Sequence, residues 1–229
     1  DPKNSKAVVG DKNIKYWKNV DMYVGGAEHA TGHLLYARFW HKFLKDIGVA
    51  VTEEPFAKMR NQGMILAADG RKMSKRWGNV VNPDDVVKTY GADTLRLYEM
   101  FIGPFDQYAS WSTDGIIGPR RFLERVWKLQ NKIDKKTKSS KEFLYILHNS
   151  IKKITLDLED MRFNTCVSAL MILLSEIEKL EKLNTDDYEK FLKILSPFAP
   201  HITEELWTEL GNKKSIHISE WPKVENKYL

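Results

Sequence analysis

Short apolar runs alternate with glycine-marked turns in the first half of the chain. Residues 21–24 are followed by Gly25 and Gly26, a pattern that predicts a strand ending in a tight turn. Residues 29–47 then predict a helix that Gly48 ends. Residues 64–66 predict a second strand, which leads into a turn at residues 68–70. This alternation indicates an α/β arrangement.

The second half of the chain has a helical pattern throughout. An upstream helix already starts at Asn82, which is suited to cap it, because Pro83 and two acidic residues follow. Beyond Gly118, apolar residues recur at spacings of four and three, as on one face of an amphipathic helix: Phe122, Val126, Leu129 and Ile133.

Two further helices are predicted toward the C-terminus. Asn164 is expected to cap the first, whose core-facing residues are Val167, Leu170, Leu174 and Ile177. The second starts near Thr185, and prolines at 197 and 200 should kink it or make it restart. We therefore predict two domains, an α/β domain over residues 1–112 and an all-α domain over residues 113–229.

Composition narrows the class of protein only slightly. The chain has 229 residues, and 42% of them are hydrophobic, which is enough for real cores. No stretch approaches the roughly 20 apolar residues of a membrane span. The single cysteine, Cys166, excludes an internal disulfide framework and fits a reducing cytosol. The N-terminus has neither an initiator Met nor a signal segment, and it is interpreted as the middle of a longer chain.

Positive charge is concentrated in one segment. Residues 114–141 contain nine Lys or Arg and three acidic residues, a local charge of +6 against +5 for the whole chain. Four of these cations form a stripe about 100° around the helix from its apolar face: Arg121, Arg125, Lys128 and Lys132. The stripe is a candidate for contacting the phosphates of a polyanion, although a solvated helix face remains the alternative.

The first candidate for chemistry is a lysine-rich loop after the second predicted strand. It begins at Gly70 and reads Gly-Arg-Lys-Met-Ser-Lys. Lys72 and Lys75, with Ser74 between them, can surround a phosphate chain and stabilise a pyrophosphate as it leaves ATP. A bare pair of lysines at this spacing is more often an exposed basic hairpin, and the loop lacks the second glycine of a Walker-type loop.

The second candidate lies where the first strand ends and a helix begins. Gly26 allows a ligand to approach the backbone, and Glu28 can accept hydrogen bonds from ribose hydroxyls. His29 and His33 are four residues apart and would share one face of a continuous helix. A pair of core or surface histidines is the alternative, and a zinc site is disfavoured because no third ligand is near.

These residues resemble the class I aminoacyl-tRNA synthetases, and within them the leucyl-tRNA synthetases. Residues 72–76, Lys-Met-Ser-Lys-Arg, are similar to the family's second signature, Lys-Met-Ser-Lys-Ser, with Arg76 in place of the final Ser. Residues 28–36, Glu-His-Ala-x-x-His-Leu-Leu-Tyr, are similar to the leucyl members. Residues 163–165 and 195–207 resemble the helical anticodon-binding-type bundle. In that bundle, His201 and Trp207 are interpreted as structural.

The resemblance implies a fold, a reaction and a set of site residues. The fold would be the second half of a Rossmann-like catalytic domain followed by an α-helical bundle. The reaction would be ATP-dependent activation of leucine to leucyl-adenylate and transfer to tRNA(Leu), with Mg²⁺ arriving on ATP and no dedicated metal site. Lys72, Ser74 and Lys75 would be catalytic, and the cations of the stripe would contact tRNA. ATP or the adenylate would contact Gly26, Glu28, His29, Gln62 and Met73, and leucine would contact Tyr23 and His33.

The same resemblance implies a monomeric protein of the cytoplasm with no membrane partner. The family's first signature, His-x-Gly-His, is absent, because Gly32 and His33 lack the preceding histidine. We therefore expect this chain alone to be inactive in adenylation. An isoleucine or valine enzyme, a non-catalytic RNA-binding module and a subunit of a split enzyme remain alternatives.

Overall fold

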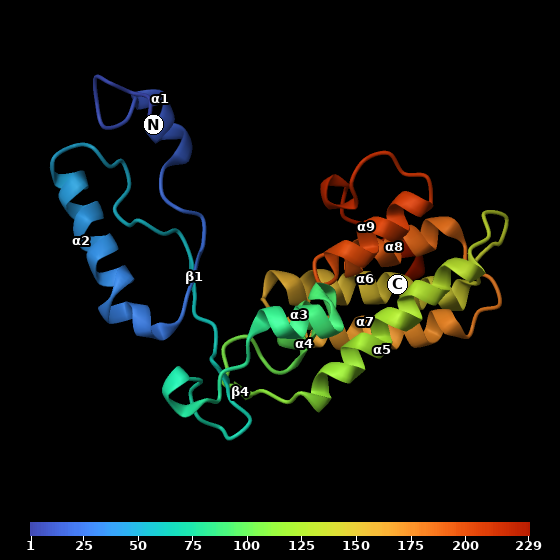
Figure 1. Ribbon diagram of the computed structural model, residues 1–229. Coiled ribbons are helices and arrows are strands. Elements are labelled where there is room, and N and C mark those ends of the chain that lie inside the picture. Colours follow the sequence, from blue (N-terminus) through green and yellow to red (C-terminus); the bar gives the residue numbers. More distant parts are fainter. The chain divides into compact units, whose positions relative to one another are not determined.

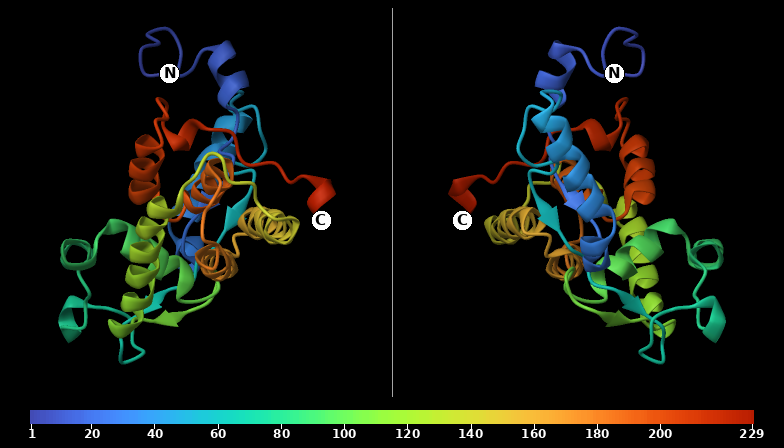
Figure 2. Two further views of the ribbon diagram at one scale, coloured as in Figure 1. Left: turned by 90° about the vertical axis from the view of Figure 1, so that its right-hand side faces the viewer. Right: turned by 90° about the vertical axis from the view of Figure 1, so that its left-hand side faces the viewer.

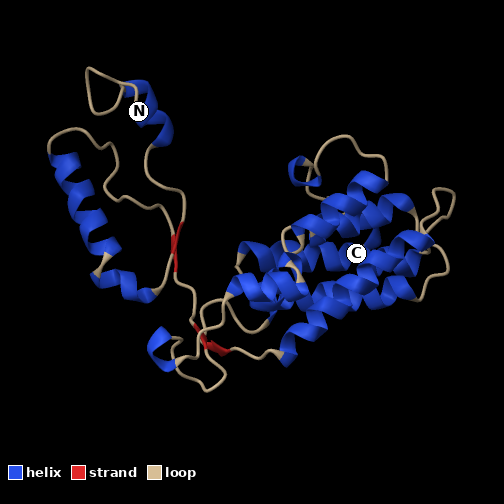
Figure 3. Cartoon of the chain, viewed as in Figure 1, coloured by secondary structure: helices blue, strands red, loops and turns tan.

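The computed structural model describes all residues, 1–229, and the chain divides into two compact units, Asp1–Met64 and Ile65–Leu229. Figure 1 labels the elements of both, and Figure 3 shows that helices predominate. Each unit is described by itself. None of the helices is both long and apolar enough to cross a membrane.

Unit 1 contains two main helices, a short 3-10 helix and one pair of strands. Its elements are α1 (Asp11–Trp17), β1 (Tyr23–Val24), η1 (Ala27–Thr31), α2 (His33–Asp46) and β2 (Met59–Arg60). Strands β1 and β2 pair in parallel, with Tyr23 opposite Met59. The loop before β2 is held to α2 by a bidentate ion pair, in which Arg38 donates to Glu54 at 2.7 and 2.8 Å.

The predicted helix over residues 29–47 is wrong at its start. Residues Ala27–Thr31 form a 3-10 helix, and α2 begins only at His33. Between them, Gly32 has φ −120° and ψ −112°, which no continuous helix can contain. His29 and His33 therefore do not belong to one helix, and the predicted shared helix face is wrong. The predicted end is confirmed, because Gly48 follows α2 with φ +78°.

Unit 2 starts with a second pair of strands and two short helices. Strand β3 (Ile65–Leu66) pairs in parallel with β4 (Ala109–Ser110), which confirms a strand at residues 65–66. Between them lie η2 (Lys75–Trp77), α3 (Pro83–Tyr90) and α4 (Ala92–Phe101). The predicted cap of α3 is confirmed, because the Asn82 side chain accepts a hydrogen bond from the Asp84 amide.

The rest of unit 2 is a helical bundle, seen from two sides in Figure 2. It comprises η3 (Asp114–Ile116), α5 (Ile117–Lys128), η4 (Leu129–Lys132), α6 (Lys141–Glu159), α7 (Phe163–Glu178), α8 (Thr185–Leu195), α9 (Pro200–Glu209), η5 (Ile216–Ile218) and η6 (Asn226–Tyr228). The expected interruption at the two prolines is confirmed, because α8 ends at Leu195 and α9 starts at Pro200.

The predicted cap at Asn164 is wrong. Helix α7 begins one residue earlier, at Phe163, with Arg162 at the cap position. The reason is the tight turn from α6: Met161 adopts a left-handed φ of +58°, and the Arg162 amide donates to the carbonyl of Asp157 at 2.7 Å. This turn brings Arg162 directly to the start of the helix.

One core joins α4 to the bundle. Leu97 of α4 is fully buried in the same cluster as Leu170 of α7 and Phe198, between α8 and α9. A second cluster, around Tyr98 and Trp111, supports the strand pair β3–β4 and includes Met73 at its edge. Residues on both sides of position 112 are therefore packed in a single unit. In unit 1, by contrast, no large apolar side chain is buried.

Candidate functional site

In unit 1, Tyr23 and His33 lie against one another. Tyr23 is the first residue of β1 and His33 the first of α2, so the strand end and the helix start bring them together. The His33 Nδ1 and Tyr23 Oη are 3.1 Å apart, and the two rings are nearly parallel, at 10°. Phe56 packs on Tyr23 at 4.6 Å between ring centroids. The half-buried pair forms an aromatic wall with polar atoms on its edge.

Gly26 and Glu28 form the second part of this region. Gly26 is buried and directly precedes η1, and a Cβ built on it would lie 2.1 Å from the Glu28 carboxylate. A side chain at position 26 would therefore displace Glu28, so the glycine allows this carboxylate to fold back over the turn. His29 and Gln62 are exposed, and neither side chain is hydrogen-bonded to Tyr23 or His33. The structure thus brings Tyr23 and His33 together, as the two predicted leucine contacts. It also places Glu28 close to Gly26.

In unit 2, the lysine loop at residues 69–78 follows β3. Gly70 adopts φ +77°, a left-handed turn that glycine tolerates, and the Ala67 amide donates to the carbonyl of Arg71 at 2.8 Å. Arg71 pairs with Asp69 at 2.6 Å and holds the pKa of that carboxyl below its usual value. The loop contains four cations and one acid, so its local charge is +3.

Lys72 and Lys75 are exposed and make no ion pair, so both ammonium groups are available to an anionic ligand. Between them, Met73 packs against the core around Tyr98, which anchors the middle of the loop. Ser74 caps η2, its hydroxyl accepting a hydrogen bond from the Arg76 amide at 3.2 Å. Two cations thus flank an anchored methionine and a capping hydroxyl.

Asn79 holds this loop closed, a role that was not predicted from the sequence. Its Oδ1 accepts from the Ser74 amide at 2.9 Å, and its Nδ2 donates to the carbonyl of Lys72 at 3.4 Å. One side chain thereby fixes the backbone between the two lysines. Its sequence signal is weak: an asparagine directly after Gly78, a residue with a left-handed φ of +62°.

The basic stripe on α5 and η4 divides into two pairs. Arg125 donates to the Glu178 carboxylate at the end of α7, and the Lys132 Nζ donates to the carbonyls of Glu178 and Leu180 at 2.6 and 2.7 Å. Glu178 holds the pKa of Arg125 above its usual value, and Arg125 lowers that of Glu178. These two cations therefore bind α7. Arg121 and Lys128 are exposed and unpaired.

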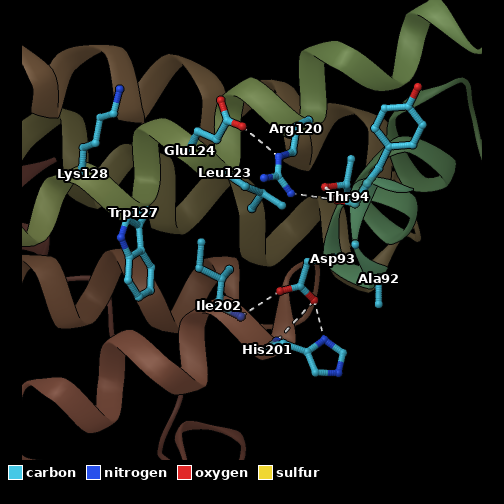
Figure 4. Close-up of a pocket in the computed structure, with 12 residues that line it drawn as sticks. Ala92, Asp93, Thr94, Arg120, Leu123, Glu124, Trp127, Lys128, His201 and Ile202 are labelled. Carbon is cyan, nitrogen blue, oxygen red and sulfur yellow. Dashed lines mark hydrogen bonds and ion pairs between the residues drawn. The ribbon is translucent and has the colours of Figure 1, made fainter. Parts of the chain in front are cut away.

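Asp93 is a buried carboxylate whose role was also not predicted from the sequence. It lies in the first turn of α4 and accepts from three donors at the start of α9: the Ile202 amide at 2.8 Å, the His201 amide at 3.3 Å and the His201 Nδ1 at 2.7 Å. It thus caps α9 from another helix. The His201 side chain stays largely exposed beside Asp93 (Figure 4), and Trp207 is buried in the core.

Comparisons with known proteins assign both parts of the chain. Residues 9–110 match the family model "tRNA synthetases class I (I, L, M and V)", and residues 140–229 match "Anticodon-binding domain of tRNA ligase". Residues 9–110 thus match the class I aminoacyl-tRNA synthetases, and residues 140–229 match the anticodon-binding domain of tRNA ligases. The fold of the chain is accordingly part of the class I catalytic domain joined to the helical anticodon-binding domain.

Within that class, the chain is similar to the leucine enzymes. It is 52% identical to leucine–tRNA ligase of Chlorobaculum tepidum over 99% of its own length, and it spans about 29% of that relative. It superposes with a TM-score of 0.83 and 33% identity on Agrobacterium radiobacter K84 agnB2 LeuRS, solved as a ternary complex with tRNA and LeuAMS; 91% of this chain and 30% of that one are covered.

A third comparison is informative about the fold alone. Mycobacterium tuberculosis methionyl-tRNA synthetase bound by methionyl-adenylate superposes with a TM-score of 0.64 and 18% identity. That superposition covers 90% of this chain and 48% of the methionyl enzyme.

Proposed function

We propose that the protein containing this chain is a leucine–tRNA ligase, which forms leucyl-adenylate from leucine and ATP and transfers leucine to tRNA(Leu). The observation that carries the proposal is the lysine loop, in which Asn79 fixes the backbone while Lys72 and Lys75 stay exposed and unpaired. Attack of the leucine carboxylate on the α-phosphorus breaks the bond to the β-phosphate oxygen. The two ammonium groups would stabilise the negative charge that develops on the leaving pyrophosphate.

The remaining site residues have the following proposed roles. Tyr23 and His33 would contact leucine, and Gly26, Glu28, His29, Gln62 and Met73 would contact ATP or the adenylate. Ser74 would support the loop as the cap of η2. Mg²⁺ would arrive with ATP as part of the substrate. No residue in the loop is suited to act as a general acid or base, so catalysis would depend on positioning and charge stabilisation.

The proposal extends to the organisation of the protein. The catalytic part would end near residue 112, and residues 113–229 would serve tRNA binding. On the stripe, Arg121 and Lys128 would contact backbone phosphates, since Arg125 and Lys132 already bind α7. A monomer acting in the cytoplasm fits these roles, and the buried thiol of Cys166 is compatible with a reducing compartment.

The test is leucine-dependent ATP–pyrophosphate exchange by the whole protein. We expect exchange with leucine, and at least a 100-fold loss in Lys72→Ala or Lys75→Ala, of the size found when one charge-stabilising donor is removed. Lys88→Ala is the matched control, because that lysine is exposed on α3 outside the loop. Exchange that depends on isoleucine or valine instead would assign another amino acid, and unchanged exchange in both loop variants would refute the role of the lysines.

This chain alone is expected to lack exchange activity. The ATP site of this class also needs the His-x-Gly-His signature, which these residues do not contain. If this chain binds tRNA with a steep salt dependence and the whole protein shows no exchange, a non-catalytic RNA-binding module is favoured.

A further inference from the structure

The lysine loop contains an exposed tryptophan to which the proposed function gives no role. Trp77 is the last residue of η2, keeps 54% of its surface exposed and belongs to neither hydrophobic cluster. The guanidinium carbon of Arg71 lies over the indole ring, 5.1 Å from its centroid, and that of Arg76 lies over it at 5.2 Å. At these distances a cation is attracted to the face of an aromatic ring. The ring is therefore held by two cations rather than by the core.

The two arginines differ in what their contacts join. Arg76 is the chain neighbour of Trp77, so its contact stays within η2. Arg71 belongs to the first arm of the loop, residues 67–72, which leaves β3, whereas Trp77 belongs to the second arm, residues 75–79. The contact between Arg71 and Trp77 therefore links the two arms, and each arm contains one of the two lysines.

Asp69 fixes the orientation in which Arg71 meets the ring. Its carboxylate accepts from the Arg71 Nε at 2.9 Å, from an Arg71 Nη at 2.6 Å and from the Arg71 amide at 3.0 Å. A guanidinium is planar and its donors point outward along its edge, so the edge can bind a carboxylate while the face stacks on an aromatic ring. A lysine ammonium group is a compact charge without a planar face, and it cannot do both.

The loop needs such a contact because its own charges oppose a closed arrangement. Its four cations and one acid leave a local charge of +3, and like charges repel until an anion binds. Asn79 joins the arms by hydrogen bonds, but its bond to the carbonyl of Lys72 is long, at 3.4 Å. We propose that the contact between Arg71 and Trp77 is a clasp, which holds both arms in the arrangement that presents the two lysines to a leaving pyrophosphate.

Arg71 and Trp77 are positioning residues in this inference, because they act through the lysines. The inference rests on the proposed function, since it concerns the same loop and the same reaction. It adds the reason why the ammonium groups are in place before charge develops on the leaving group, which is the condition for stabilising a transition state without reorganisation.

The first test measures the burst of leucyl-adenylate formation by the whole protein in a rapid-quench assay. Trp77→Ala should lower the burst rate about 2- to 5-fold, the size expected from one cation–π contact at an exposed position. The KM for ATP should change little, because the lysines stabilise the transition state rather than the bound substrate. The burst amplitude counts intact sites and should not change. A lower amplitude with an unchanged rate would show a merely structural role and would overturn the clasp.

Conservative variants separate the clasp from the charge of Arg71. Trp77→Phe keeps an aromatic face and should retain most of the rate. Arg71→Lys keeps the charge but cannot bind Asp69 and stack on the ring at once, so it should lose about as much as Trp77→Ala. The double variant should lose no more than either single variant, because each removes the same contact. A normal rate in Arg71→Lys, or losses that multiply in the double variant, would overturn the clasp.

A second measurement on the 229-residue chain needs no catalysis. The Ser74 amide lies between the arms and donates to Asn79 at 2.9 Å, so its hydrogen exchange reports the opening of the loop. Trp77→Ala should speed this exchange about 2- to 5-fold. Tyr145→Ala, which removes an aromatic ring on α6 that is 55% exposed, is the matched control and should exchange like the unmodified chain. Unchanged exchange in Trp77→Ala would overturn the clasp.

The outcomes distinguish this inference from the proposed function. If the whole protein forms no leucyl-adenylate, or if Lys72→Ala and Lys75→Ala keep the full rate, the proposed function is lost and the inference is lost with it. If both lysine variants lose activity while Trp77→Ala has the rate of Tyr145→Ala, only the clasp is overturned.

Discussion

At the scale of the residue, two buried polar side chains hold segments of the bundle together by hydrogen bonds. Asp93 joins α4 to the start of α9, and His148 of α6 holds the C-terminal segment, its Nδ1 accepting from the Glu225 amide at 3.2 Å. The His148 ring is fully buried beneath Tyr228, and its Nε2 has no hydrogen-bond partner. Neither role was predictable from the sequence, because the partners lie 109 and 77 residues away.

Replacing Asp93 with Ala should lower the free energy of unfolding by about 2 kcal/mol, because the α9 N-terminus loses its only carboxylate cap. Urea unfolding followed by circular dichroism measures the change. His201→Ala is the control, since it removes only the ring contact and leaves both amide donors bonded to Asp93. A loss in His201→Ala as large as that in Asp93→Ala would contradict the capping role.

His148 should make stability depend on pH. Burial lowers the pKa of His148, with a further lowering by Lys190, against weaker opposing effects of Glu225 and Asp187. Below about pH 6.5 the unfolded histidine takes up a proton that the folded one refuses, so the free energy of unfolding should fall as pH falls from there. Above that pH the contribution is fully present.

The measurement for His148 compares urea unfolding at about pH 7.5 and about pH 5.5, on either side of the ordinary histidine pKa. His148→Gln retains a hydrogen-bond acceptor for the Glu225 amide and cannot titrate, so its stability should fall less between these two pH values. Identical losses in both proteins would mean that other groups cause the pH dependence.

At the scale of the element, local sequence signals located helix ends well when the cause was local. The Asn82 cap, the stop at Gly48 and the restart at Pro200 were all predicted. The start of α2 was not predicted. Residues 29–31 also form a helix, the 3-10 helix η1, and only the backbone angles of Gly32 separate it from α2. The use of the α5 stripe was equally hidden, since Glu178 lies 53 residues beyond Arg125.

The two pairs of the stripe should respond differently to substitution. Lys132→Met should lower the free energy of unfolding by about 1–2 kcal/mol, because its ammonium group binds the carbonyl of Glu178, the last residue of α7, and that of Leu180 just beyond it. It should leave the salt dependence of tRNA binding unchanged. Arg121→Ala should do the opposite, preserving stability while lowering the salt slope by about one. Urea unfolding and filter binding on the same preparations decide between these roles, and a lower slope in Lys132→Met would contradict the division.

At the scale of the whole molecule, the two units differ in how far their apolar side chains are buried. The bundle buries its apolar residues, whereas Tyr16, Phe39 and Trp40 in unit 1 are each more than half exposed. The predicted site residues are divided between the units, with Tyr23 and His33 in unit 1 and the lysine loop in unit 2. Motifs in the sequence predicted both groups of residues. The support given by Asn79 required coordinates, because a single asparagine in a loop has many local uses.

This difference in burial predicts unequal stability along the chain. Local opening free energies follow buried apolar contacts, so backbone amides of α2 should exchange hydrogen much faster than those of α6 and α7. Limited proteolysis of the 229-residue chain should accordingly cut first within residues 1–64 and leave a resistant product that contains the bundle. In the whole protein, where the rest of the catalytic domain can cover the exposed side chains, α2 should gain protection while α6 and α7 change little. Equal protection of α2 and α6 from hydrogen exchange in this chain alone would contradict the prediction. It would mean that unit 1 is stable without a buried core, although its aromatic residues are exposed.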